Sequence, residues 1–306
     1  MEEPRKKGKK ELLPIFFMGC FFVIINGIAL LLSHIFIGAG MEVFEQADDP
    51  MNLVWVFLTI LGMTIVILLI AKFWKKRLIQ FIILFAVGYT SFYIFLPLFS
   101  LVISNWVVSV LLSIILAVCL VVVLVKYPEW YVIDLCGIII GAGAVALFGI
   151  SLSILLVLIL LIGLAVYDAI SVYKTKHMID LADTVMDLKL PVLLVVPKIR
   201  HYSLLKETKR LKEKLRDGEE REAFFMGMGD VVMPGILVAT VYAGDPSWLP
   251  IALSVLVGTL VGFAALMTFV IKGKPQAGLP LLCSGAILGY LISSYVFFGT
   301  LVGLSF

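Results

Sequence analysis

The chain has 306 residues, of which 62% are hydrophobic and only 15% are charged, with a mean hydropathy of +1.12 and a formal net charge of +3. A soluble core of this size cannot bury so many apolar side chains, so a soluble globular protein is excluded and an all-α polytopic membrane protein is predicted. The net charge says little because the charges are segregated along the chain, and no nucleic-acid partner is predicted.

Nine membrane-spanning helices are predicted in chain order, because a hydrocarbon core about 30 Å thick requires roughly 20 helical residues per span. The basic stretch before the first span leads into an apolar run too long for a cleavable signal peptide. Only Gly149-Ile-Ser151 separates the fifth span from the sixth. The predicted spans are 12–37, 51–71, 78–102, 106–125, 130–148, 151–173, 223–243, 249–271 and 277–304.

The positions of lysine and arginine predict the orientation, since positive loops stay in the cytoplasm. With nine spans, all 24 basic residues fall on the side of the N-terminus. The charged residues on the opposite side are acidic: Glu42, Glu45, Asp48, Asp49 and Asp245. The pattern therefore predicts a cytoplasmic N-terminus and an extracytoplasmic C-terminus.

The spans divide the chain into an N-terminal part, 1–173, a cytoplasmic loop, 174–222, and a C-terminal part, 223–306. Within the loop, the spacing of apolar residues over 177–189 predicts an interfacial helix. A following apolar, β-branched run lies between two prolines and is too short to span. It predicts either a short strand with free edges or a loop dipping into the headgroups, and it comprises Val192, Leu193, Leu194, Val195 and Val196.

Two aspartates lie inside apolar segments, where a carboxylate is costly and indicates a functional site. Asp168 lies six residues before Lys174, about 9 Å along a helix, and Asp230 lies nine residues after Arg221, about 13 Å. On consecutive antiparallel helices these depths are nearly equal. We therefore expect the two carboxyls to face each other.

Two carboxylates that share a site of low dielectric cannot both ionise easily, so the pair holds a single proton. One group then activates water as a base, and the other protonates a carbonyl oxygen or a leaving amine as an acid. Peptide hydrolysis requires these two roles. Intramembrane aspartates also serve as proton or cation relays in transporters, or as hydrogen-bond anchors between helices, and the two aspartates alone leave these alternatives open.

Other polar residues in the apolar segments support fewer hypotheses. Asp134, near the start of the fifth span, is interpreted as a residue that snorkels to the headgroups or packs between helices. The four cysteines form no CxxC pair and the three histidines form no HExxH, so neither a metal nor another cofactor is predicted. Gly227 and Gly229, just before Asp230, remove side-chain bulk and let another backbone approach that carboxyl.

Three short motifs stand in order on the expected spans. Tyr167-Asp168, Gly227-Met-Gly-Asp230 and Gln276-Ala-Gly-Leu-Pro280 resemble the YD, GxGD and PAL motifs of the presenilin and signal peptide peptidase family of intramembrane aspartyl proteases. The resemblance implies that Asp168 and Asp230 form the catalytic dyad. It also implies that residues beside the dyad position the substrate, namely Tyr167, Gly227, Gly229, Gln276, Ala277, Gly278, Leu279 and Pro280. Ala277 stands where the family usually has proline.

The charge pattern is similar to that of presenilins, so the resemblance implies transmembrane helical substrates with their N-termini outside. The chain resembles the compact microbial, archaeal homologues, which implies a prokaryotic plasma membrane and no need for accessory subunits, with a homo-oligomer left open. A further hypothesis is that Val192 to Val196 captures the unwound substrate as an added strand. The alternatives are a proton- or cation-coupled transporter using the same carboxyls and a non-catalytic membrane-protein binder.

Overall fold

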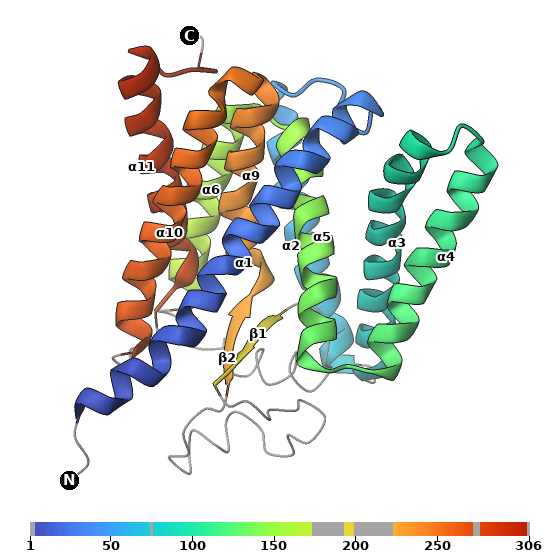
Figure 1. The fold of residues 1–306 in the computed structure, drawn as a ribbon, viewed down its shortest axis with the longest axis horizontal. Coiled ribbons are helices and arrows are strands. Elements are labelled where there is room, and N and C mark those ends of the chain that lie inside the picture. The colour runs from blue at the N-terminus through green and yellow to red at the C-terminus, as the bar shows by residue number, and fades with distance from the viewer. Residues whose placement is uncertain (1–3, 74–75, 173–192, 199–222, 272–275, 305–306) are drawn as a thin grey trace.

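The computed structural model describes residues 4–73, 76–172, 193–198, 223–271 and 276–304. Within these ranges the chain is mostly helical, and each predicted span overlaps one helix (Figure 1). The helices are α1 (Pro4–Gly38), α2 (Pro50–Phe73), α3 (Lys76–Val102), α4 (Trp106–Lys126), α5 (Trp130–Ser151), α6 (Ile154–Ile170), α9 (Met228–Gly244), α10 (Leu249–Ile271) and α11 (Gly278–Phe298). A 3₁₀ turn, η2 (Pro246–Trp248), joins α9 to α10, and two strands, β1 (Leu193–Pro197) and β2 (Ala223–Gly227), pair with each other.

The helices run side by side as one bundle, with the two chain ends at opposite ends of it (Figure 1). Among the described residues, six helices are long and apolar enough to cross a membrane, and α6, α9 and the segment Pro50–Val66 of α2 are shorter apolar helices. Many large apolar side chains on the outer faces are exposed, as a lipid environment requires. The predicted polytopic helical membrane fold is therefore confirmed.

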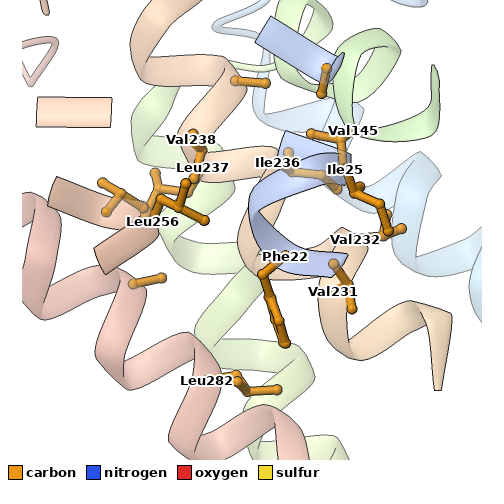
Figure 2. Close-up of a cluster of buried hydrophobic side chains, with 14 of the residues drawn as sticks. Phe22, Ile25, Val145, Val231, Val232, Ile236, Leu237, Val238, Leu256 and Leu282 are labelled. Carbon is orange, nitrogen blue, oxygen red and sulfur yellow. The ribbon is translucent and has the colours of Figure 1, made fainter. Parts of the chain in front are cut away.

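Helix α9 lies at the centre of the bundle, and its apolar side chains face several other helices (Figure 2). Val232 and Ile236 of α9 lie beside Ile25 of α1 and Val145 of α5, and Leu237 lies beside Leu256 of α10. All of these side chains are buried. Because packing surrounds α9, the position of its first turn is fixed by the whole bundle.

Helices α10 and α11 approach each other closely through glycine. A Cβ on Gly258 would collide with the carbonyl oxygen of Gly285, and a Cβ on Gly285 would collide with that of Gly258. Such contacts replace the hydrophobic effect as the source of helix association in lipid. They fix α11, whose first residues carry the PAL-like motif.

The start of the predicted seventh span is wrong. Residues 223–227 form strand β2, and α9 begins only at Met228. The strand pairs antiparallel with β1, Leu193 opposite Gly227 and Pro197 opposite Ala223. A short apolar run is compatible with either helix or strand, and here a partner strand far away in the sequence decides between them.

The boundary between the fifth and sixth spans also differs from the prediction. Helix α5 continues to Ser151, and the break falls at Leu152, which is extended with φ −125° and ψ 142°. The segment between α1 and α2 stabilises this break, because the backbone N–H of Val43 donates to Ser151 Oγ and that of Ser153 donates to the Ala47 carbonyl. The predicted interfacial helix, 177–189, and Val192 lie outside the described residues.

Candidate active site

Asp168 and Asp230 lie at helix ends in the same part of the bundle. Asp168 is two residues from the end of α6, and Asp230 is the third residue of α9, in its first turn. The backbone of Gly227 is extended at φ −62° and ψ 132° and turns strand β2 directly into α9. The strand thus ends three residues before Asp230.

The first residues of α11 contact both carboxyls. The backbone N–H of Leu279 donates to Asp168 Oδ2 with an N···O distance of 3.1 Å. A Cβ on Gly278 would lie 3.2 Å from Asp230 Oδ2 and 3.4 Å from its Oδ1. The two aspartates and the PAL-like motif, distant in the sequence, therefore converge on one point.

The predicted close backbone approach to Asp230 occurs at Gly278 of α11. A Cβ on Gly227 would lie 3.4 Å from Asp230 Oδ2, so this glycine also contributes to the limited space around the carboxyl. A Cβ on Gly229 would meet nothing within 4 Å. The space beside Gly229 is therefore open in the described structure.

The remaining residues of the YD and PAL-like motifs differ in exposure. Tyr167 is exposed, whereas Ala277 is fully buried and Gln276 and Pro280 are partly buried. Ala277 has φ −66° and ψ 128° and precedes the first turn of α11. Proline prefers these angles, so the backbone keeps the conformation that the family's usual residue would impose.

Cys283 belongs to no CxxC pair, and the sequence analysis gave it no place in the site. It lies one turn after Leu279 on α11 and is fully buried. Its spacing of four residues from Leu279 indicates that both side chains lie on the same face of α11, since residues four apart share a face of a helix. Cys283 therefore forms part of the apolar wall beside the carboxyl pair.

The sheet beside the site is anchored by a third acid. Asp134 of α5 is 4% exposed, and its Oδ1 accepts a hydrogen bond from the backbone N–H of Val195 in β1 at 2.8 Å. Asp134 was expected to snorkel to the headgroups or to pack between helices; it is buried, and its hydrogen-bond partner is strand β1. Burial and the bond to β1 both hold this side chain inside.

The bond to Asp134 also establishes which way each residue of β1 faces. Because the Val195 N–H points to Asp134, it points away from β2. In an antiparallel ladder the backbone N–H and C=O groups of the neighbouring Leu194 and Val196 then point toward β2. Val195 lies opposite Phe225, whose backbone groups point to the outer edge of β2. Within the described part of the chain the sheet has these two strands, so that outer edge has no strand partner there.

The comparisons with known proteins establish the family. The model described as signal-peptide peptidase, presenilin aspartyl protease matches residues 19–300. The chain therefore belongs to the presenilin and signal peptide peptidase family of aspartyl proteases, as its motifs predicted.

Solved structures of a presenilin family intramembrane aspartate protease are similar to this chain over nearly its whole length. The structure in the P2 space group is 36% identical, covers 93% of this chain and 98% of its own, and has a TM-score of 0.68. The structure in the C222 space group is also 36% identical, covers 92% and 98%, and has a TM-score of 0.64. No match is found among curated proteins.

Proposed function

We propose that this chain is an intramembrane aspartyl endopeptidase in which Asp168 and Asp230 are the catalytic residues. The observation that carries the proposal is the convergence of both carboxyls on Gly278 and Leu279. Membership of an aspartyl protease family supports the same activity. No third acidic side chain is needed for the reaction, since one proton shared between two carboxyls supplies a base and an acid.

The hydrogen bond from Leu279 assigns the roles. An N–H donor stabilises the ionised form of the carboxyl that accepts it, so Asp168 is the base and Asp230 carries the proton. Asp168 takes a proton from water as the water oxygen bonds to the scissile carbonyl carbon, and Asp230 donates its proton to the carbonyl oxygen. When the C–N bond breaks, Asp168 protonates the leaving amine and Asp230 recovers a proton from the diol, which restores the pair.

The substrate reaches this pair after local unwinding, because a transmembrane helix hides its peptide groups in its own hydrogen bonds. The sheet offers replacement bonds by strand addition. The Val195 N–H on the outer edge of β1 already donates to Asp134, so this edge is not free to pair with a substrate. The outer edge of β2 is therefore the side that receives the substrate. The segment from Leu193 to Val196 thus supports the added strand through β2, and the open space at Gly229 admits the substrate backbone toward Asp230.

The bundle crosses the membrane nine times in this proposal, with its N-terminus in the cytoplasm. The opposite positions of the two chain ends (Figure 1) and the segregation of all 24 basic residues to one side support an odd number of spans in this orientation. The substrates are transmembrane helices with external N-termini, and Tyr167, Gln276, Ala277 and Pro280 help to position them. The enzyme acts in a prokaryotic plasma membrane without accessory subunits.

Isosteric replacement of each aspartate tests the proposal. Asp168→Asn and Asp230→Asn each remove one acid–base group, and we expect the rate of cleavage of a reporter transmembrane helix to fall about 10²- to 10⁴-fold. The matched control is Asp245→Asn, since Asp245 is partly exposed, lies at the other end of α9, and an amide oxygen still accepts the bond from the Ser247 N–H.

Purified protein and the reporter in liposomes allow both outcomes to be measured together. A transition-state analogue of aspartyl proteases should block cleavage by the wild type. Undiminished cleavage by either variant would remove that aspartate from the mechanism. Ion uptake that disappears in the same variants, without proteolysis by the wild type, would instead identify a transporter.

A further inference from the structure

Asp134 is a buried acid that the proposed mechanism does not use. It lies five residues into α5, and its Oδ2 is buried with no hydrogen-bond partner in the described part of the chain. Burying a carboxyl with an unpaired oxygen costs free energy, and leucine or isoleucine would pack there without that cost. The hydrogen bond from Oδ1 to Val195 is the contact that distinguishes an acid from an apolar residue at this position.

This bond is a directional contact between α5 and the sheet. Apolar packing accompanies it, since Val195 and Ala223 lie in one cluster with Ile133 and Cys136 of α5. Apolar packing lets a strand slide, whereas an N–H···O bond admits one register. A two-stranded ribbon has marginal stability by itself, so its position depends on such an anchor.

We propose that Asp134 is a positioning residue that determines which peptide bond of the substrate is cleaved. The inference rests on the proposed function above. Its bond to Val195 closes the outer edge of β1, leaves β2 as the side for substrate addition, and holds the sheet at one height on α5. Strand β2 runs through Gly227 into the first turn of α9, so the height of the sheet sets the substrate residue that lies opposite Asp230.

Substitutions on both sides of the bond test this role. Asp134→Asn keeps the Oδ1 acceptor, and Asp134→Leu has the same branching at Cγ without an acceptor. Val195→Pro removes the donor N–H, which points away from β2, so the ladder between β1 and β2 keeps its hydrogen bonds. Cys136→Ala is the packing control, because it removes a buried side chain from the same cluster and no hydrogen bond of the sheet.

Each variant is purified as the full chain, and the reporter helix is cleaved in liposomes. The measurements are kcat, KM and the cleaved bonds, identified by mass spectrometry of the products. We expect the Asn variant to cut the wild-type bonds with kcat/KM within twofold of the wild type. The Leu and Pro variants should lose at least tenfold in kcat/KM, mainly through KM, and distribute their cuts over neighbouring bonds. The double variant D134L/V195P should be no worse than either single one, because both remove the same bond.

Three results would overturn the positioning role. The first is that Asp134→Leu and Val195→Pro cleave the reporter at the same bonds as the wild type. The second is that Cys136→Ala distributes its cuts over neighbouring bonds as these variants do. The third is that the losses in kcat/KM add up in the double variant. Thermal unfolding in detergent identifies a variant that has not folded, and Val195→Pro then tests the same bond from the strand side.

Failure of the proposed function gives a different pattern, since the wild type itself would then leave the reporter intact. In that case hydrogen exchange of the peptide covering 193–198 tests whether Asp134 anchors strand β1. Faster exchange in Asp134→Leu than in Asp134→Asn supports it, and equal exchange overturns it.

Discussion

Two residues at the start of α11 contribute differently to the site, although they belong to one motif. Ala277 contributes a backbone conformation, with φ −66° and ψ 128°, and Leu279 contributes an N–H to Asp168. Alanine here has the backbone angles that the family's usual proline would also adopt. The N–H of Leu279 has no such substitute.

Proline substitutions at these positions should therefore have opposite effects. Ala277→Pro fits the observed angles, and we expect it to retain cleavage and to raise the free energy of unfolding by about 0.4–1 kcal/mol by restricting the unfolded chain. Leu279→Pro lies in the first turn of α11, where proline is tolerated, but it removes the bond to Asp168 and should lower cleavage strongly.

Thermal unfolding and the reporter assay measure both variants. A loss of stability in Ala277→Pro would show that the fully buried site of Ala277 has no room for the ring. Wild-type cleavage by Leu279→Pro would show that the N–H of Leu279 does not support the dyad.

At the scale of elements, the sheet connects the long loop to the carboxyl pair. Leu194 and Val196 face β2, and β2 continues into the first turn of α9, so the ladder between the strands positions the approach to Asp230. The side chain of Leu194 is 1% exposed and lies against Gly137 of α5, where a Cβ would be 3.1 Å from Leu194 Cδ2. Backbone pairing and side-chain packing therefore both hold this residue.

Two substitutions at Leu194 separate these contributions. Leu194→Pro removes an N–H from the ladder, and we expect it to abolish cleavage while the detergent-extracted protein stays folded. Leu194→Ala keeps the N–H but leaves a cavity, which should cost about 2–5 kcal/mol of stability and spare part of the activity. Size-exclusion profiles establish folding, and the reporter assay measures cleavage. Unaltered cleavage by the proline variant would reject strand addition at this sheet.

At the scale of the whole molecule, the bundle surrounds α9 and leaves the α3–α4 hairpin at one side (Figure 1). The first turn of α9 carries Asp230, α6 brings Asp168 and α11 brings Leu279, so three helices from separate parts of the chain form one site. The geometry of the carboxyl pair therefore depends on the assembled bundle.

The proposed orientation can be tested with single cysteines in a chain whose four natural cysteines are replaced. Glu45→Cys and Asp245→Cys lie on the side without basic residues, and Lys126→Cys lies on the other. A membrane-impermeant maleimide should label the first two in intact cells and Lys126→Cys only after permeabilisation. Labelling of residues 45 and 245 from opposite sides would contradict nine spans.

The sequence alone determined the helical membrane fold and the family, because apolar length, charge distribution and short motifs are local properties of the chain. It left both a strand and a headgroup loop open for Leu193 to Val196. The tertiary structure decided the features that depend on distant partners: the strand at 223–227, the break after Ser151 and the bond of Asp134 to Val195. Residues far apart in the sequence supply these hydrogen bonds, so no local pattern in the sequence records them.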